Sequence, residues 1–176
     1  MKQILICTLM NMSISCFGLS VHVKRVIDGD TFETIDGERV RLIGINAPEI
    51  SDIFGKESKD YLSNLINGKL IDLRKDNKSN DRDRYNRLLR YVYLNEIDIN
   101  KTMIIEGYAF AYLKFKFDKS ESYENAQRIA QNNNYGIWAN NNFRNVEENN
   151  SSTKKYFIIF ILVIMSVIGC YYYFSN

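Results

Sequence analysis

The side chains that could do chemistry in this chain are carboxylates and arginines, gathered in three short stretches. These stretches are VIDGDT at 26–31, VRLIGINAPE at 40–49 and DRDRYNRLLRYVYL at 81–94. Arg41 begins an apolar run, Glu49 follows the only proline of the chain, and Arg87 leads into an apolar run of its own. Hydrolysis of a phosphodiester needs a base for water and positive charge on the phosphoryl oxygens, usually with a metal ion. A guanidinium can hold two phosphate oxygens at once, so this set of residues suits that reaction.

The composition excludes several other chemistries. All three cysteines lie in the apolar ends of the chain, so the middle has no thiol nucleophile and no thiolate metal site. The single histidine, His22, argues against Ser-His-Asp catalysis and multi-histidine zinc sites, and we interpret it as a surface residue. From Lys24 to Lys155 the chain has 22 basic side chains (23 in all, less Lys2) and 21 acidic ones. A domain so close to neutral must meet a polyanion through a local cluster of charge.

The spacing of apolar residues predicts the elements that position these side chains. It predicts strands at 21–27, 31–35, 39–45, 70–73 and 88–94, and helices at 56–66, 97–106 and 120–133. This order is that of a small Greek-key barrel of the oligonucleotide/oligosaccharide-binding (OB) kind. We therefore expect an α+β domain, mainly a five-stranded OB-fold barrel with about three helices; a generic α+β domain is the alternative. Four further apolar residues are expected to pack in its core: Tyr108, Phe110, Ile137 and Trp138.

The barrel explains how distant residues could meet. With the third and fifth strands as neighbours, Arg41, Arg87 and Glu49 can converge on one mouth of the barrel. Pro48 keeps Ala47 out of the helical region and ends the strand, which turns Glu49 back toward the barrel. A structural salt bridge is the alternative role for Arg41 and Glu49.

With EGYAFAY at 106–112 and NYGIW at 134–138, the three stretches resemble the staphylococcal nuclease (thermonuclease) family in order and spacing, from residue 21 to 140. The resemblance implies a calcium-dependent endonuclease that cleaves DNA and/or RNA with little sequence preference and leaves 3′-phosphate ends. It implies that Glu49 is the general base and that Arg41 and Arg87 stabilise the transition state.

The resemblance also implies two sets of binding residues. Asp30, Asn46 and the backbone carbonyl of Ala47 would bind Ca²⁺, which prefers oxygen ligands. Tyr85 and Tyr112 would contact the substrate, single-stranded or frayed DNA or RNA, and packing at the barrel rim is the alternative for Tyr112.

Two residues depart from the family pattern. Asn86 replaces the usual glycine of Tyr-Gly-Arg, and asparagine tolerates a positive φ well. Asn46 stands where the family commonly has a metal-binding aspartate, and its amide oxygen brings no negative charge. We expect a weaker calcium site, with Asp28 adding charge from nearby. The alternative function is a non-catalytic OB-fold nucleic-acid-binding module that has lost activity through Asn46, and a tail-anchored scaffold is a third.

The two ends of the chain differ from its middle. Residues 1–20 resemble a signal peptide or an N-terminal apolar leader, and residues 141–155 form an Asn-rich linker. The nineteen uncharged residues at 156–174 would span ~28 Å as a helix, which is enough to cross a bilayer. We expect a single-pass membrane protein whose domain, a monomer without protein partners, is extracytoplasmic. Lys154 and Lys155 favour the opposite orientation, and a removable anchor signal is a further alternative.

Overall fold

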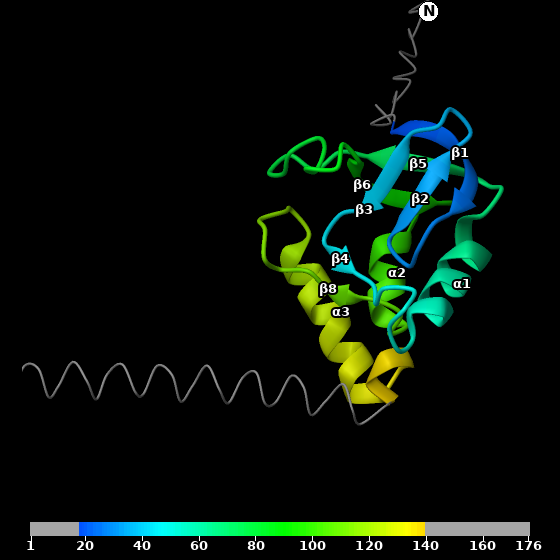
Figure 1. Ribbon diagram of the computed structural model, residues 1–176. Helices are drawn as coiled ribbons and strands as arrows, with labels where there is room; N and C mark the ends of the chain where they lie inside the picture. Colours follow the sequence, from blue (N-terminus) through cyan, green and yellow to red (C-terminus); the bar gives the residue numbers. More distant parts are fainter. Residues whose placement is uncertain (1–17, 140–176) are drawn as a thin grey trace, which may run out of the picture.

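Five β-strands close into a barrel in the computed structural model, which describes residues 18–139 (Figure 1). The strands are β1 (Leu19–Val26), β2 (Thr31–Thr34), β3 (Arg39–Leu42), β5 (Leu70–Arg74) and β6 (Leu88–Leu94). Antiparallel pairings give the order β3-β2-β1-β5-β6, and a parallel pairing of β3 with β6 closes the barrel. In that pairing Arg41 lies opposite Leu89. The predicted five-stranded OB-like barrel is confirmed.

Three helices accompany the barrel, as predicted. They are α1 (Gly55–Ile66), α2 (Ile99–Ile105) and α3 (Ser120–Asn133), followed by a 3₁₀ turn, η1 (Gly136–Ala139). Figure 1 shows α1 on one side below the barrel and α3 on the other. The predicted start of the second helix is wrong, because residues 97 and 98 form a short strand, β7 (Ile97–Asp98), against β6. The Asp98 carboxylate then accepts a hydrogen bond from the Lys101 N–H and caps α2.

The predicted strand at 39–45 is in fact two strands with a bend between them. Gly44 has a φ of +77°, so β3 ends at Leu42 and the chain turns into β4 (Ile45–Asn46). The new strand pairs with β8 (Phe110–Ala111), away from the barrel sheet. This bend matters for function because it directs the residues after it toward the turn between β1 and β2.

A buried asparagine holds the bend against β6. Asn100 is fully buried, and its side-chain amide donates to the carbonyl oxygens of Ile43 at 2.9 Å and Arg90 at 3.1 Å. Its side-chain oxygen accepts a hydrogen bond from the Val92 N–H at 3.0 Å. One side chain from α2 therefore bonds the Ile43 carbonyl beside the break and the Val92 N–H of β6, and it adds a second donor to the Arg90 carbonyl, which also accepts from the Ile43 N–H.

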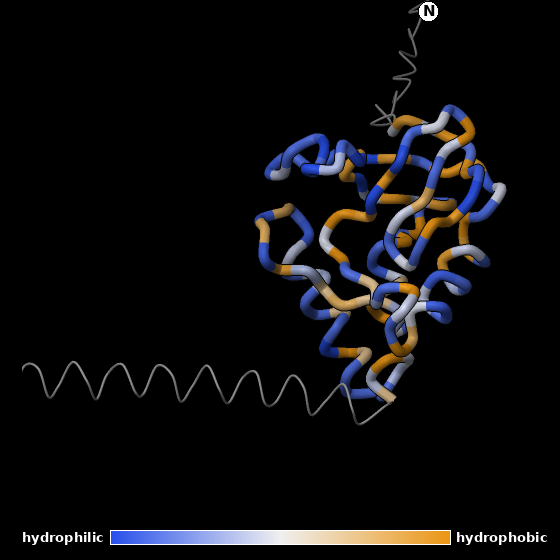
Figure 2. Tube along the Cα trace, in the orientation of Figure 1, coloured by the Kyte–Doolittle hydropathy of each residue, from blue (hydrophilic) through white to orange (hydrophobic). Residues whose placement is uncertain are grey.

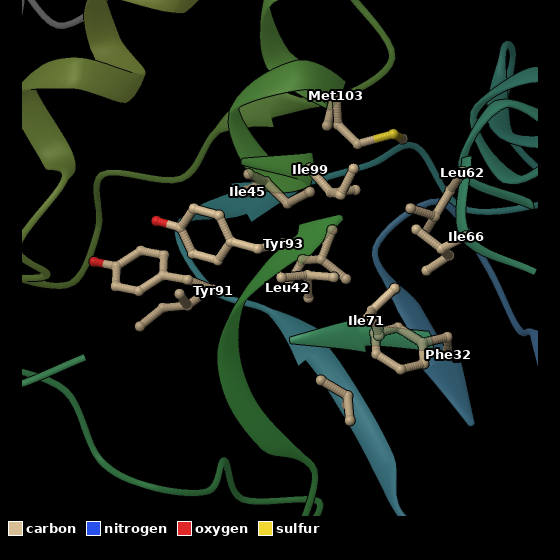
Figure 3. Packing of buried hydrophobic residues seen from close by; sticks show 14 of the residues in the cluster. Phe32, Leu42, Ile45, Leu62, Ile66, Ile71, Tyr91, Tyr93, Ile99 and Met103 are labelled. Atoms are coloured by element: carbon tan, nitrogen blue, oxygen red, sulfur yellow. The ribbon is translucent and has the colours of Figure 1, made fainter. Parts of the chain in front are cut away.

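The core fills the barrel and continues down to α1 and α2. Figure 3 shows Phe32, Leu42 and Ile71 from the strands facing Leu62 and Ile66 of α1. Ile137 and Trp138 are buried in a smaller cluster beneath α3, while Tyr108 and Phe110 are partly buried and pack against the core and this cluster. The prediction that these four residues serve packing is confirmed, and His22 lies on the surface as expected.

One loop of the barrel is notably polar. In Figure 2 the segment between β5 and β6 is hydrophilic along nearly all its length. Within residues 18–139 no helix is long and apolar enough to cross a membrane. The predicted linker at 141–155 and membrane helix at 156–174 lie outside the described residues, as does most of the predicted leader. Strand β1 begins at Leu19, so it includes the last two residues of that leader.

We expect Asn100→Ala to lower the free energy of unfolding by about 3 kcal/mol, because it leaves buried backbone groups of the bend and of β6 without partners. Urea unfolding would measure the loss. Asn133→Ala is the matched control, since the Asn133 side chain makes one exposed hydrogen bond to the Ile129 carbonyl at the end of α3. Equal, small losses in the two variants would contradict the role given to Asn100.

Candidate active site

A buried carboxylate joins three segments at one mouth of the barrel. Asp30, at the turn between β1 and β2, is 7% exposed. Its Oδ2 lies 2.6 Å from Arg41 Nη1 and accepts a hydrogen bond from the Ala47 N–H at 3.1 Å. Its Oδ1 accepts from the Thr31 hydroxyl at 2.9 Å. Arg41 Nη2 in turn donates to Asn46 Oδ1 at 3.2 Å, so the structure brings together four of the predicted site residues.

The Asp28-Gly29-Asp30 turn fits closely beneath Ala47 and α1. A Cβ on Gly29 would lie 2.5 Å from the Ala47 Cβ and 2.7 Å from the Ser58 Cβ, so only glycine allows this approach. The Asp30 N–H donates to Asp28 Oδ1 at 2.9 Å. Burial, together with the nearby Asp30 carboxylate, raises the pKa of Asp28. A cation bound at this turn would relieve both effects.

A second carboxylate positions the other arginine. Asp83 Oδ2 accepts a hydrogen bond from Arg87 Nε at 2.7 Å and also lies 2.7 Å from Arg87 Nη2. Asp83 Oδ1 accepts a hydrogen bond from the backbone N–H of Arg87 at 3.0 Å. Asn86 has a φ of +63°, so the turn survives the loss of glycine as expected. Arg87 Nη1 donates to the Thr31 hydroxyl at 3.2 Å, and that hydroxyl bonds Asp30. Arg87 therefore reaches the same mouth as Arg41.

Asp83 and Thr31 were not predicted as site residues. The spacing of Asp83 and Arg87, four residues apart, was a visible signal, because such a pair can form a salt bridge across a tight turn. Thr31 gave no comparable signal, since a threonine that opens a strand is common.

Glu49 lies apart from this cluster of contacts. It is exposed in the loop between β4 and α1, and within the described part of the chain its carboxylate has no hydrogen-bond or ion-pair partner. The loop folds back tightly: the Asp52 N–H donates to the Glu49 carbonyl oxygen at 2.8 Å, and a Cβ on Gly55 would lie 1.8 Å from that oxygen. Arg41 does form an ion pair, but with Asp30 rather than Glu49. Within residues 18–139 the Glu49 carboxylate is thus unpaired, and its convergence with the arginines stays a prediction.

A groove of about 620 Å³ runs from Arg41 and Arg87 between residues 78–87 and residues 112–117. Both segments project from the same side of the barrel in Figure 1. The groove is lined by basic side chains, namely Arg41, Lys78, Arg82, Arg84, Arg87, Lys114 and Lys116. Among the described residues that line it, Asp83 alone is acidic. This is the local cluster of positive charge that a near-neutral domain would need to hold a polyanion.

Aromatic rings lie on both walls of the groove. Tyr85 is 63% exposed on one wall, with the Arg84 guanidinium 4.6 Å from its ring centroid. On the other wall Tyr112 is half-buried, its N–H donates to the Gly44 carbonyl at 2.9 Å, and its ring lies 5.8 Å from that of Phe115. Phe115 is 64% exposed, and the sequence pattern did not distinguish it from a core residue.

The oxygen atoms at the mouth suit a hard cation. Within residues 18–139 no three acidic, histidine or cysteine side chains gather as a metal site. A cation at this mouth would instead depend on the carboxylates of Asp28 and Asp30, the amide oxygen of Asn46 and the carbonyl oxygen of Ala47. Carboxylate, amide and carbonyl oxygens are ligands that Ca²⁺ accepts, so the residues fit that ion by type.

Residues 39–140 match the family described as Staphylococcal nuclease homologue. The chain belongs to this family. It is 39% identical over 125 residues to a protein of Haemophilus influenzae named an uncharacterized endonuclease, covering 69% of this chain and 67% of that one. It is 36% identical over 132 residues to the thermonuclease of Staphylococcus intermedius, and the match covers 69% of this chain and 77% of that one. It is 34% identical over 128 residues to the thermonuclease of Staphylococcus hyicus, and the match covers 67% of this chain and 75% of that one. The resemblance seen in the sequence is therefore confirmed for the staphylococcal nuclease homologue family.

In this family member, we expect Asp83→Asn to lower the free energy of unfolding by about 2 kcal/mol at neutral pH, because an amide nitrogen would face the Arg87 guanidinium. Burial opposes ionisation of Asp83, but hydrogen bonds from the Arg87 N–H and guanidinium outweigh it and lower its pKa. A lowered pKa in the folded state gives stability that is full above the unfolded value and lost as pH falls through the folded one. The difference between wild type and variant should therefore shrink only below about pH 4.

Urea unfolding over a pH series measures that difference. Asp36→Asn is the control, because Asp36 is exposed in a hairpin turn and has no ion-pair partner within residues 18–139. A stability difference for Asp83→Asn that grows in acid would contradict the pairing.

Proposed function

We propose that this protein is a nuclease that hydrolyses phosphodiester bonds of DNA and/or RNA with the help of Ca²⁺. The supporting observation is that Arg41 and Arg87 are both held toward one mouth, through Asp30, Thr31 and Asp83, at the head of a basic groove. Membership of a family whose relatives are named endonuclease and thermonuclease supports the same activity.

The groove accounts for binding without sequence preference. Its lysines and arginines attract backbone phosphates, which are the same in every sequence. Tyr85 and Phe115 on opposite walls offer ring faces on which bases can stack, and stacking tolerates every base. Unstacked bases reach such rings only in single-stranded or frayed nucleic acid, so we propose those as the substrate.

The residues at the mouth then divide the reaction between them. Glu49 accepts a proton from a water molecule, whose oxygen attacks the phosphorus. The bond from phosphorus to the 5′ oxygen breaks and that oxygen takes up a proton from solvent, so one product ends in a 3′-phosphate and the other in a 5′-hydroxyl. Arg41 and Arg87 donate to the phosphoryl oxygens, where negative charge increases in the transition state. Because their partners hold both guanidiniums in place beforehand, this stabilisation needs little rearrangement.

The proposed Ca²⁺ would be held by Asp30, Asn46 and the Ala47 carbonyl, with Asp28 adding negative charge nearby. When bound, the ion supplies positive charge to a phosphoryl oxygen. Asp30 also pairs with Arg41, so the same carboxylate would serve the ion and orient a guanidinium.

We further propose that the domain is a monomer tethered to a membrane by residues 156–174 and faces the outside of the cell. The lack of charge over those residues and the apolar leader at 1–20 support this.

The decisive experiment for catalysis is cleavage of a single-stranded oligonucleotide by the full chain, in millimolar Ca²⁺ and in chelator. We expect Glu49→Gln to lower kcat by at least about 100-fold, because the amide cannot accept the proton. Glu57→Gln is the matched control, since Glu57 is exposed in the first turn of α1. Cleavage that survives both chelator and Glu49→Gln would refute the mechanism, and binding without any cleavage by wild type would favour the non-catalytic module.

Asn46→Asp tests the calcium site without measuring activity. The substitution adds a negative charge to the proposed ligands, and the charge of the ligands tunes calcium affinity. We expect the Kd for Ca²⁺, measured by titration calorimetry, to fall about tenfold or more. Asn125→Asp adds the same charge on α3 and should leave the Kd unchanged. Equal affinities in wild type and Asn46→Asp would remove Asn46 from the site.

A further inference from the structure

The two walls of the groove come from segments far apart in the sequence, and one buried carboxylate joins them. Asp76 follows β5, two residues before the wall that begins at Lys78. It is 1% exposed and is not one of the residues that line the groove. The other wall ends at Phe117, next to Asp118, and Asp118 is a direct partner of Asp76.

Each oxygen of Asp76 holds a different part of the fold. Oδ1 accepts hydrogen bonds from the N–H groups of Lys78 and Ser79, both at 2.8 Å, and so shapes the start of the first wall. Oδ2 accepts from the Asp118 N–H at 2.7 Å, which fixes the end of the second wall. Oδ2 also accepts from the Tyr91 hydroxyl at 2.6 Å, which ties the junction to β6.

Tyr91 extends the same junction. Its ring is buried among the barrel side chains, and Figure 3 shows its hydroxyl pointing out of that apolar cluster. The hydroxyl oxygen accepts a hydrogen bond from the Lys119 N–H at 3.3 Å while its hydrogen goes to Asp76. Two successive backbone groups after the second wall are thus held by this pair of side chains.

Other contacts between the walls are exposed. Lys78 Nζ lies 3.1 Å from Asp118 Oδ1, and Asn77 Nδ2 donates to Asp118 Oδ2 at 3.2 Å. Exposed pairs of this kind hold two segments weakly because water competes for both partners. Burial of Asp76 by itself would raise its pKa, but the hydrogen bonds from Asp118, Tyr91, Lys78 and Ser79 outweigh it and lower the pKa. The carboxylate is therefore charged at neutral pH.

We propose that Asp76 is a positioning residue: it fixes the two walls of the groove relative to each other, and affinity for a nucleic acid strand depends on it although it touches no substrate. This inference rests on the proposed function, because it assigns the groove to nucleic acid. Asn at position 76 would turn an N–H group toward the Asp118 N–H, and two donors repel. The second wall, with Phe115 and its lysines, would then lose its place opposite Tyr85.

The test compares a substrate that fills the groove with one that reaches only the mouth. The full chain, purified in non-ionic detergent, would be titrated with a fluorescein-labelled oligothymidylate of eight nucleotides in chelator, with anisotropy as the readout. We expect Asp76→Asn to raise the Kd about tenfold, the scale of one lost base-stacking contact. In Ca²⁺, kcat/KM for the octanucleotide relative to a thymidine dinucleotide should fall about tenfold as well, while kcat on the dinucleotide changes less than about twofold.

Two further variants separate positioning from stability. Tyr91→Phe keeps the Asp76 carboxylate and removes one partner, so it should give a smaller rise in Kd, about threefold, and it decides the question if Asp76→Asn does not fold. Ile66→Val provides a destabilised control with an intact junction, because Ile66 is buried in α1, which Figure 1 shows on the opposite side of the molecule from residues 78–87 and 112–117. It should leave the Kd and the ratio of the two substrates unchanged.

Different outcomes contradict different claims. An unchanged Kd and ratio in both Asp76→Asn and Tyr91→Phe would overturn the role of Asp76, even if wild type proves to be a nuclease. An equal change of the Kd and of the substrate ratio in Ile66→Val would also overturn the role of Asp76. Failure of wild type to cleave either substrate would overturn the proposed function, and the binding titration would still decide whether Asp76 positions the groove.

Discussion

The parallel pairing of β3 with β6 is the constraint on which the site depends. It closes the barrel, and its register sets Arg41 opposite Leu89, two residues beyond Arg87. Since side chains alternate along a strand, a slip of one residue would turn Arg41 to the other face and separate the two arginines. The bend at Gly44 and the buried side chain of Asn100 protect this register, because they stop β3 at Leu42 and give the chain beyond it fixed partners.

Within that frame, each arginine is oriented by its own carboxylate, and a hydroxyl links the two pairs. Asp30 holds Arg41, Asp83 holds Arg87, and Thr31 bonds both Asp30 and Arg87. A guanidinium without such a partner would sample many rotamers in solvent, and ordering it when substrate binds would cost conformational entropy. The carboxylates therefore reduce the positive charge that the guanidiniums offer to a phosphate, but they fix the position of that charge. In the proposed reaction this exchange would favour a transition state, whose geometry is specific, over loosely held ground states.

The sequence was enough to predict the barrel, because alternating apolar residues mark β1, β2, β3, β5 and β6, and the helices follow from the spacing of their apolar residues. It also located Asp30, Arg41, Asn46 and Ala47, which the structure brings into contact. What it missed depends on three-dimensional context. In the sequence, Gly44 looks like part of a continuous apolar strand at 39–45. Asp98, which caps α2, falls inside the helix predicted at 97–106. The role of Asp76 gives no local signal, because the two partners that make it a junction, Tyr91 and Asp118, are 15 and 42 residues away in the sequence.

The balance of charge shows how a neutral domain can present a basic groove. Four basic side chains of the groove are paired with acids: Arg41 with Asp30, Lys78 with Asp118, Arg82 with Glu38 and Arg87 with Asp83. Within the described residues, Arg84, Lys114 and Lys116 of the groove have no ion-pair partner. The positive potential is thus produced by basic side chains that gather around one groove, where Asp83 is the one acidic lining residue among those described, rather than by an excess of bases in the domain. Such a potential acts over about one Debye length, roughly 8 Å at physiological salt, and in the proposed function it would draw a strand into the groove.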